Sequence, residues 1–378
     1  MKRILAGVSA AAFGCGAASA ELATDGGIEM IPAASKLAEE VHFFHDIVLM
    51  PVITVISTVV LGLLLWVMIR FNSKANPTPR KFSHNTFVEV VWTGVPILIL
   101  VYIALFSFDL LFKEDTIPDG RQAVAQADGD TSAFVFKNDF PESRRLVRPE
   151  HIQVFLASAL GERRLDYRTD YTLEGLGKPE VTVTLNEAPA RGKRVVIRGG
   201  RSLVGSAGFL GFGEDTREIA MAPTMTLKVV GAQWYWISSY PDFGDFELVS
   251  NMLPEEETTQ ELYRLEVDNH VVVPVGETIR VTTTARDVIH AWALPNFAIK
   301  IDAVPGRINE TWFKAERVGT YYGQCSEICG IRHAFMPIAV DVVSRPAFEA
   351  WVDKERALAG LEPMFAGPDA KLAQASAE

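Results

Sequence analysis

Two long apolar stretches dominate the first third of the chain. The first runs roughly over residues 45–69 and the second over residues 90–112. Each exceeds the ~20 apolar residues with which an α-helix crosses the hydrocarbon core of a bilayer. Pro51 and Pro96 stand near the starts of the stretches, where a helix tolerates proline best. The pattern predicts a transmembrane α-helical hairpin within residues 21–113, and two buried helices of a soluble core are the less favoured alternative.

The hydrophobic pattern becomes strand-like after the second stretch and is most regular over residues 225–353. Many short alternating runs separated by turns indicate an all-β sandwich. The strands expected in this region are Thr226–Val230, Tyr263–Val267, Val271–Val273, Thr278–Thr283, Thr311–Phe313 and Ile338–Val343. The fold class is therefore a helical hairpin followed by an all-β sandwich.

An inserted region, residues 114–224, separates the hairpin from the sandwich. Three alternating runs predict strands between Gly-rich turns: His151–Leu156, Val181–Leu185 and Val195–Ile197. Arginine is frequent here, but acidic residues nearly match it. A small surface β-element, a partner-binding element and a partly disordered segment all remain open for this region.

Both ends of the chain carry their own signals. Residues 1–20 combine a basic start, an apolar run and Ala18-Ser19-Ala20, which predicts a secretory signal peptide cut before Glu21. A lipid anchor on Cys15 is the alternative, although the residues before Cys15 match such a signal poorly. At the other end, the Ala-rich residues 354–378 predict a mobile tail.

Charge predicts how the hairpin is oriented. The loop between the two apolar stretches holds Arg70, Lys74, Arg80 and Lys81 and no acidic residue. By the positive-inside rule this loop is cytoplasmic, so both termini and the sandwich lie outside. A bacterial-type signal peptide makes that side the periplasm and the membrane the bacterial inner (plasma) membrane. The net charge of −11 disfavours a nucleic-acid partner, which would require a basic surface.

Candidate metal chemistry is concentrated in residues 325–336, Cys-Ser-Glu-Ile-Cys-Gly-Ile-Arg-His-Ala-Phe-Met. This segment offers two thiols, one imidazole and one thioether, and His290 offers a second imidazole 35 residues upstream of Cys325. Soft thiolate and thioether ligands combined with imidazole suit a copper site for electron transfer. A single Cys would suffice for one copper ion, whereas two provide enough sulfur to bridge two.

Two other interpretations of the same segment remain. A disulfide between Cys325 and Cys329 would be ordinary in an oxidising compartment, but it would leave His333 and Met336 unexplained. A zinc site is disfavoured because zinc rarely takes methionine. Removal of Cys15 with the signal peptide would leave no other cysteine for a structural disulfide.

Three ordered motifs resemble those of cytochrome c oxidase subunit II around its CuA centre. They are Asp287–Trp292, Asp302–Arg307 and Tyr321–Gly330, the last followed by His333 and Met336-Pro337. The resemblance covers about residues 225–345, and the hairpin extends it. It implies a cupredoxin-like Greek-key sandwich and a bacterial haem-copper oxidase of the aa3 type.

The resemblance also implies a dinuclear CuA centre of two copper ions. Six residues would bind the coppers: Cys325 and Cys329 as bridges, His290 and His333 as one ligand each, Met336 as a weak ligand, and Glu327 through its backbone carbonyl. The Glu327 side chain would face a Mg²⁺ ion shared with subunit I.

The activity that the resemblance implies is electron transfer within an enzyme complex. The chain would accept electrons from cytochrome c and pass them to a haem of subunit I, where O₂ is reduced and protons are pumped. Haems would occur only in subunit I, and the further partners would be subunit III, the lipid bilayer and copper-delivery proteins. The alternative is a membrane-tethered CuA module serving a reductase of nitrogen oxides, although a simple tether needs only one span. A related quinol oxidase subunit is excluded because it lacks the copper ligands, which are present here.

Two residues outside the ligand set have roles implied by the resemblance. Trp234, in Gln233-Trp234-Tyr235-Trp236, would lie exposed where cytochrome c docks, whereas ordinary aromatic packing is expected of its aromatic neighbours. Glu89, at the cytoplasmic start of the second apolar stretch, would lie at the mouth of a proton channel into subunit I. The alternative for Glu89 is a favourable interaction with the N-terminal end of a helix dipole.

An acidic surface would support a cationic partner. Residues 225–353 hold 18 acidic against 10 basic residues. Such a surface steers a lysine-rich cytochrome c, and ordinary solubility is the alternative explanation. The candidate docking residues are Asp242, Asp245, Glu247, Glu255, Glu256, Glu257 and Asp268.

Overall fold

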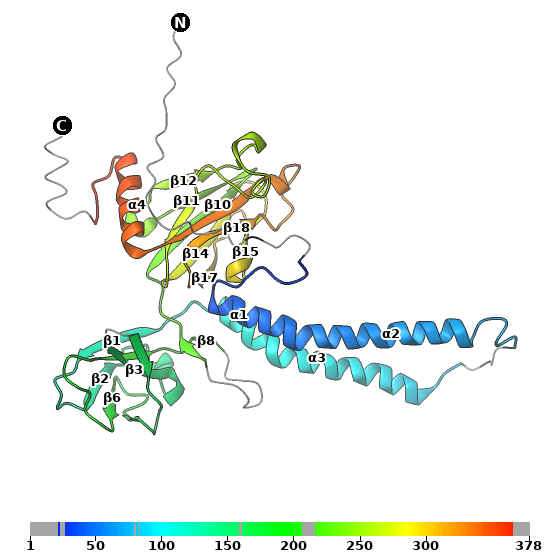
Figure 1. Cartoon of the computed structure of the whole chain (residues 1–378), viewed down its shortest axis with the longest axis horizontal. Helices are drawn as coiled ribbons and strands as arrows, with labels where there is room; N and C mark the ends of the chain where they lie inside the picture. The colour runs from blue at the N-terminus through cyan, green and yellow to red at the C-terminus, as the bar shows by residue number, and fades with distance from the viewer. Residues whose placement is uncertain are drawn as a thin grey trace, which may run out of the picture.

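The computed structural model describes residue 22 and residues 27–78, 81, 83–158, 161–205 and 216–365. The predicted signal peptide with Cys15, the cleavage site before Glu21, and residues 366–378 lie outside the described residues. The described chain forms a helical hairpin, a small β unit and a larger β-sandwich (Figure 1). The fold class expected from the sequence is confirmed.

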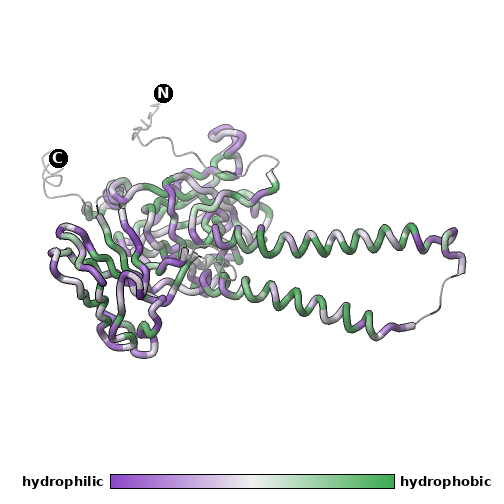
Figure 2. The backbone as a smooth tube through the Cα atoms, turned by 60° about the horizontal axis from the view of Figure 1, so that its bottom comes forward, coloured by the Kyte–Doolittle hydropathy of each residue, from purple (hydrophilic) through white to green (hydrophobic). Residues whose placement is uncertain are grey.

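The hairpin consists of two long apolar helices. α1 (Lys36–Phe43) continues through a π-helical segment, η1 (Phe44–Leu49), into α2 (Met50–Arg70), and α3 (Thr86–Asp115) returns beside them. Both helices are long and apolar enough to cross a membrane, and their most apolar windows are not buried inside the protein. Figure 2 shows hydrophobic residues along both arms of the hairpin. Side chains this apolar and this exposed require a non-aqueous surrounding.

Ion pairs join the two helices where they meet the β units. The Lys113 ammonium lies 2.5 Å from a carboxylate oxygen of Glu40 and 2.7 Å from one of Asp109. The Lys113 and Glu40 side chains are each only 14% exposed. Glu40 also accepts a hydrogen bond from the backbone N–H of Gly205, and the Trp312 indole donates to the carbonyl of Lys113 at 3.1 Å. These contacts fix the hairpin to both β units.

The small β unit is formed by the inserted region. Its two antiparallel sheets have the strand orders β1-β7-β3-β4 and β2-β6-β5, and a short pair, β8-β9, stands beside them. The sheets share a core that includes Phe136, Leu146 and Val154. The strands are β1 (Arg121–Gln126), β2 (Ala133–Lys137), β3 (Ile152–Ser158), β4 (Gly161–Arg164), β5 (Tyr171–Glu174), β6 (Glu180–Leu185), β7 (Arg194–Gly199), β8 (Leu203–Val204) and β9 (Glu218–Ile219). The three strands predicted here coincide with β3, β6 and β7.

The larger unit is a sandwich of a five-stranded sheet, β12-β11-β10-β14-β17, and a three-stranded sheet, β13-β19-β18, with the hairpin β15-β16. β10 pairs in parallel with β14 and β13 with β19, so the chain crosses between non-consecutive strands as well as forming hairpins. The strands are β10 (Met225–Ala232), β11 (Tyr235–Ser239), β12 (Glu247–Ser250), β13 (Val271–Pro274), β14 (Thr278–Ala285), β15 (His290–Leu294), β16 (Ile299–Ala303), β17 (Asn309–Lys314), β18 (Gly319–Gln324) and β19 (Pro337–Val343).

A buried aromatic core fills the sandwich and continues to the end of β18. Trp292, Phe313 and Tyr321 are fully buried or nearly so, and Cys325 belongs to the same core cluster. The Phe297 ring stacks on Phe313 with 4.8 Å between ring centroids. The loop that follows β18 is therefore anchored directly in the core.

The strand predicted over Tyr263–Val267 is wrong. The chain turns here, because the N–H groups of Leu265 and Glu266 both donate to the carbonyl of Leu262, at 2.8 and 3.0 Å. Arg264 has φ +69°, a left-handed conformation that a strand does not contain. The apolar side chains instead pack into a small cluster with Tyr322.

A C-terminal helix, α4 (Arg345–Leu358), packs on the sandwich through its buried face. The predicted tail boundary at residue 354 does not match the end of an element, because α4 runs through it. Beyond α4 the chain folds back: Asp353 accepts hydrogen bonds from the backbone N–H groups of Met364 and Phe365, at 2.5 and 3.1 Å. The Phe365 ring lies 6.0 Å from the Phe243 ring. Residues 354–365 are therefore held against the sandwich.

A charged cluster braces the three-stranded sheet around His270. Its Nε2 lies 2.5 Å from a Glu266 oxygen and its Nδ1 lies 3.1 Å from an Asp341 oxygen. The Tyr322 hydroxyl donates to the other Glu266 oxygen at 2.7 Å. Burial lowers the pKa of the His270 imidazole, but the two carboxylates outweigh burial and raise this pKa to about 10.

The stability of the sandwich should therefore depend on alkaline pH through His270. The imidazolium contributes fully below the ordinary pKa of about 6.5, and its contribution is lost as pH rises toward about 10. We expect the unfolding temperature of the chain in detergent, followed by near-UV circular dichroism, to fall across this window. His270→Gln should lose about 1–3 kcal/mol of unfolding free energy at pH 6 and show a flatter profile above it. Parallel pH profiles for the two proteins would contradict this role.

Candidate metal centre

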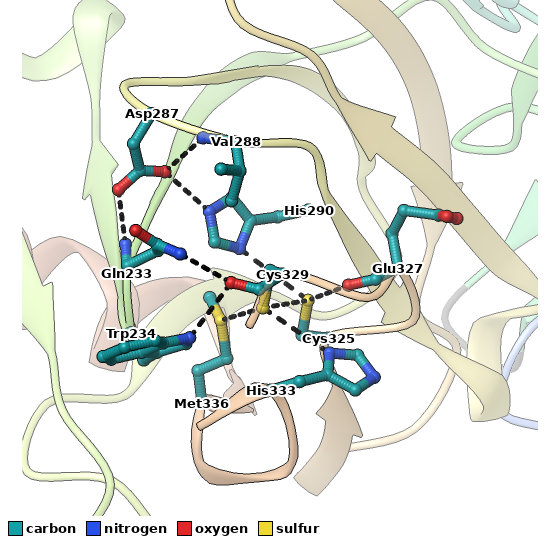
Figure 3. Close-up of polar contacts among 10 residues, drawn as sticks. All are labelled: Gln233, Trp234, Asp287, Val288, His290, Cys325, Glu327, Cys329, His333 and Met336. Atoms are coloured by element: carbon teal, nitrogen blue, oxygen red, sulfur yellow. Dashed lines mark hydrogen bonds and ion pairs between the residues drawn. The ribbon is translucent and has the colours of Figure 1, made fainter. Parts of the chain in front are cut away.

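Residues 325–336 form the loop that joins β18 to β19, and His290 is the first residue of β15 beside it (Figure 3). The N–H of Ser326 donates to the carbonyl of Ala291 at 3.1 Å, which ties the loop to β15. The N–H of Cys325 donates to the carbonyl of Met336 at 3.4 Å, which closes the loop on itself. Residues distant in sequence are thereby brought to one place.

The six residues expected as copper ligands converge at this place. The two cysteine sulfurs lie 3.8 Å apart and form the centre of the group. The other donor atoms surround the sulfurs: His290 Nδ1 3.9 Å and the Glu327 carbonyl 3.4 Å from Cys325 Sγ, and His333 Nδ1 and Met336 Sδ each 3.5 Å from Cys329 Sγ. In Figure 3 these groups point toward one another from the loop and from β15.

The disulfide interpretation does not hold in this structure. Cys325 and Cys329 are free thiols, and their sulfurs are too far apart for the ~2.05 Å bond of a disulfide. Both cysteines are buried, as are His290 and Met336. The two thiols, the His290 ring and the Met336 thioether are thus held in the interior, whereas His333 and Glu327 are partly exposed.

Burial raises the pKa of both thiols, but their other surroundings shift the two pKa values in opposite directions. For Cys325, the hydrogen bond to His290 and contacts with the backbone of Glu327 and Ala291 outweigh burial and lower the pKa. For Cys329, the charge of Cys325 adds to burial and keeps the pKa high. One thiolate therefore forms readily, and the second needs a cation to replace its proton. Metal binding provides that cation.

The donor set fits copper. The ligand atoms of His290, Cys325 and Cys329 all lie within 4.8 Å of one another. Two thiols, two imidazoles and a thioether are soft or borderline ligands, which favour copper over the oxygen-seeking Mg²⁺ and Ca²⁺. A thioether beside the thiols also distinguishes the site from structural zinc sites of Cys and His.

Asp287 organises the surroundings of His290. One Asp287 oxygen lies 2.9 Å from His290 Nε2 and accepts from the N–H of Val288 at 2.7 Å. The other oxygen accepts from the N–H of Gln233 at 2.7 Å. A carboxylate on Nε2 leaves Nδ1 to face the sulfurs, as in other metal sites. Sequence reasoning assigned no role to Asp287, although a carboxylate three residues before a ligand histidine was a usable signal.

The turn between β10 and β11 places an indole against the loop. Trp234 is partly buried, and its Nε1 donates to the carbonyl of Cys329 at 3.2 Å. Gln233 Nε2 donates to the same carbonyl at 2.7 Å. Trp236 is buried and donates to the carbonyl of Met336 at 3.2 Å. Two tryptophans of one short segment thus bind the loop, one at the surface and one in the core.

Two predicted site residues lie away from the sulfurs. The Glu327 side chain is 44% exposed, points outward in Figure 3 and lies 4.0 Å from the Lys300 ammonium. Glu89 lies in the first turn of α3. There it accepts a hydrogen bond from the N–H of Asn85 at 3.3 Å, while the Asn85 side chain accepts from the N–H of Val88 at 3.2 Å. Glu89 is therefore part of a helix cap.

All seven predicted docking acids have exposed side chains. Two of them also have structural roles. Asp242 accepts from the N–H of Thr226 at 2.6 Å, and Asp268 accepts from the N–H of Asn251 at 2.7 Å. Exposure therefore leaves these acids accessible, but Asp242 and Asp268 also hold turns.

The chain is similar to known proteins along most of its length. Residues 225–343 match the family description "Cytochrome C oxidase subunit II, periplasmic domain", and residues 23–110 match "Cytochrome C oxidase subunit II, transmembrane domain". A "Probable cytochrome c oxidase subunit 2" of Rickettsia bellii is 34% identical over 87% of this chain and 84% of the relative. The "Cytochrome c oxidase subunit 2" of Cereibacter sphaeroides is 30% identical over 88% of this chain and 81% of the relative.

Solved structures are similar to part of the chain, and one of them illustrates this. The periplasmic domain of subunit II of the cytochrome oxidase of Bradyrhizobium japonicum is 52% identical, covers 36% of this chain and 95% of that structure, and has a TM-score of 0.34. Neither family description extends over residues 111–224.

Gly330 allows the indole to approach the loop, and its replacement should show this. Gly330 has φ +120°, and an added Cβ would lie 3.0 Å from Gln233 Nε2 and 3.1 Å from the Trp234 ring. We expect Gly330→Ala to lower the unfolding free energy by about 1–3 kcal/mol through overpacking, beyond the backbone strain. Gly161→Ala is the matched control, because Gly161 has φ +123° and no atom within 4 Å of the added Cβ. Equal losses in denaturant titrations of the two variants would refute the contact.

Proposed function

The chain belongs to the cytochrome c oxidase subunit II family, and from this premise we propose that it transfers electrons from cytochrome c to the haem of subunit I. The observation that supports the proposal best is the buried pair of free thiols with an imidazole against each sulfur. Buried soft donors of this kind suit a metal that exchanges electrons without leaving the protein. O₂ reduction and proton pumping would take place in subunit I.

We infer that two copper ions bind here. His290 approaches Cys325 and His333 approaches Cys329, so the donor set has two ends and each end has its own imidazole. The Glu327 carbonyl and the Met336 thioether supply one further donor near each sulfur. When bound, the copper pair would accept and release one electron shared between both ions. The surrounding hydrogen bonds would hold the ligands in nearly the same positions in both redox states.

Trp234 is proposed as the point of electron transfer from cytochrome c. Its indole is partly exposed and donates a hydrogen bond to the carbonyl of Cys329, so it lies between solvent and the sulfurs. The exposed acids of the sandwich would attract a basic cytochrome c and orient it. Copper-delivery proteins would load the site while both thiols are free.

Four further assignments complete the proposal. The half-exposed Glu327 carboxylate would bind a Mg²⁺ shared with subunit I, since its carbonyl faces the sulfurs and its carboxylate faces outward. Glu89 would lie at the mouth of a proton channel, because it stands at the end of the hairpin opposite the metal centre. The basic loop between α2 and α3 would place that end in the cytoplasm, and the copper centre and both termini in the periplasm of a bacterial inner membrane. Subunit III would complete the assembly.

Purification of the complex through this chain tests the function directly. We expect a haem-bearing subunit, two copper ions per copy of this chain, and cyanide-sensitive oxidation of cytochrome c. Electron paramagnetic resonance should show a mixed-valence signal with one electron shared equally by two coppers. Recovery of one zinc and no copper would refute the metal assignment, and a complex that reduces only nitrogen oxides would refute the electron acceptor.

Trp234→Phe should slow electron acceptance from cytochrome c, because the indole and its hydrogen bond to Cys329 are lost. We expect a decrease of roughly tenfold to a hundredfold, in the range that small losses of positioning produce. Stopped-flow reduction of the copper centre measures the rate, and the copper spectrum should remain intact. Tyr235→Phe is the matched control at the next residue and should leave the rate unchanged. A normal rate in Trp234→Phe would remove this residue from the route.

Substitutions of Glu89 can separate a proton-channel role from its role in the helix cap. Glu89→Gln keeps an acceptor oxygen for the Asn85 N–H but cannot carry a proton, whereas Glu89→Ala loses both functions. We expect both variants to slow proton uptake by roughly one to two orders of magnitude, since proton transfer through a side chain contributes at least that much. Electron acceptance from cytochrome c should not change. If Glu89→Gln takes up protons normally and only Glu89→Ala is slow, Glu89 is a helix cap alone.

A further inference from the structure

The inserted β unit meets the hairpin around a large cavity. This cavity has a volume of about 1070 Å³ and lies between α1, the last turns of α3 and the pair β8-β9. Phe43, Leu105 and Phe112 form an apolar wall on the hairpin side. Arg144 and Arg201 belong to the opposite wall, which the inserted unit supplies. The hairpin side therefore combines an apolar wall with charged side chains, and the β unit adds basic ones. The charged residues from the hairpin are Lys36, Glu39, Glu40, Asp109 and Lys113.

A second, smaller cavity adjoins the first and is strongly cationic. It has a volume of about 350 Å³ and is lined by Arg145, Arg148, Arg201 and His151, with Glu142 as its one carboxylate among the described lining residues. Arg201 lines both cavities, so they share a wall. The smaller cavity is large enough for a phosphate group with part of a headgroup.

Two nitrogen atoms in the smaller cavity are buried without a hydrogen-bond partner, Nε of Arg145 and Nδ1 of His151. Buried polar atoms in folded proteins nearly always have partners, so an unpaired donor indicates a missing acceptor. Arg201 is exposed, and its guanidinium forms no hydrogen bond or ion pair within the described part of the chain. Two buried unpaired nitrogens and one exposed guanidinium thus lie around one cavity.

The charges in the smaller cavity favour an anion. Arg145 is only loosely paired with Glu142, at 3.7 Å, and Arg148 lies 3.3 Å from Glu150, which does not line the cavity. Burial lowers the pKa of the His151 imidazole, and Arg201 and Arg148 lower it further against the opposing effects of Glu150 and Asp119. Two guanidinium groups, those of Arg201 and Arg148, therefore lie close enough to act on the charge of the imidazole.

The larger cavity is also lined by three carboxylates, all on the hairpin side. Glu40 and Asp109 both pair with Lys113, and Glu39 has no basic partner among the described residues. Arg144 pairs with Asp119 at 2.7 Å on one side and still lines the cavity. Arg144 and Arg201 are therefore among the arginines that the inserted unit presents to this cavity, near the end of α3.

We propose that the inserted unit binds an anionic phospholipid from the leaflet next to the β units. The guanidinium groups of Arg145, Arg148 and Arg201, together with His151, hold the phosphate, because planar guanidinium groups match phosphate oxygens in pairs. The acyl chains lie against Phe43, Leu105 and Phe112 in the larger cavity. Bound lipid would seal the junction between the hairpin and the inserted unit. This role does not depend on copper or on electron transfer.

Lipid retention by the purified complex tests the proposal. The complex is stripped in detergent, reconstituted into nanodiscs of phosphatidylglycerol and phosphatidylcholine, extracted again, and examined by native mass spectrometry. We expect retained phosphatidylglycerol on the wild-type chain and at least about tenfold less on the double variant Arg145→Gln, Arg201→Gln. The matched control is Arg191→Gln, Arg194→Gln, two exposed arginines of the same unit that line neither cavity. Equal retention by both double variants would overturn the proposal.

A second measurement on the wild-type complex does not depend on how the variants fold. Phosphatidylglycerol should raise the unfolding temperature of the stripped complex, and phosphatidylcholine at the same concentration should raise it less. Inorganic phosphate is the third arm and should have little effect. If inorganic phosphate stabilises the complex as well as phosphatidylglycerol does, the site binds free phosphate and the lipid assignment is wrong. If none of the three stabilises it, the anion site itself is refuted.

Discussion

The close approach of two buried sulfurs is the constraint on which the rest of the sandwich depends. Cys325 and Cys329 lie 3.8 Å apart in the core, where two thiolates would repel each other strongly. The loop can hold them only because its backbone is fixed at several points. Ser326 binds the carbonyl of Ala291, and Trp236 binds the carbonyl of Met336 from the core. The aromatic core below therefore holds the two sulfurs in contact, and a bound cation would balance the charge of a second thiolate.

The same constraint organises the surface above the sulfurs. Asp287 contacts His290 with one oxygen and the Gln233 backbone with the other, so one carboxylate links a candidate ligand to the turn that carries Trp234. Trp234 and Gln233 then both bind the carbonyl of Cys329. A displacement of this turn would therefore change the surroundings of both sulfurs. The hydrogen bonds thus give the indole and the donor atoms a single fixed geometry.

The hairpin and the inserted unit follow a different physical rule. The two helices of the hairpin are stable only where a bilayer covers their apolar side chains. The β units instead need water at their surfaces. Their junction is held by Lys113, Glu40 and Gly205, and by the Trp312 indole. Such a polar junction at the end of a transmembrane span leaves room between unlike surfaces. An amphipathic lipid would match both surfaces, which is why we assign one to this place.

The sequence by itself determined the features that depend on local periodicity and on residue identity. These are the two helices, five of the ten described strands of the sandwich and the Cys, His and Met candidate ligands, because apolar runs, alternation and soft donors are visible without long-range contacts. The Glu327 carbonyl was expected only from the family resemblance. Tertiary structure alone decided that Tyr263–Val267 turns, since Arg264 takes a left-handed conformation to bury its neighbours. It alone joined Asp287 to Gln233 and gathered Arg145 and Arg201 around one cavity. These groups are far apart in sequence, and only packing of the folded chain brings them within reach of one another.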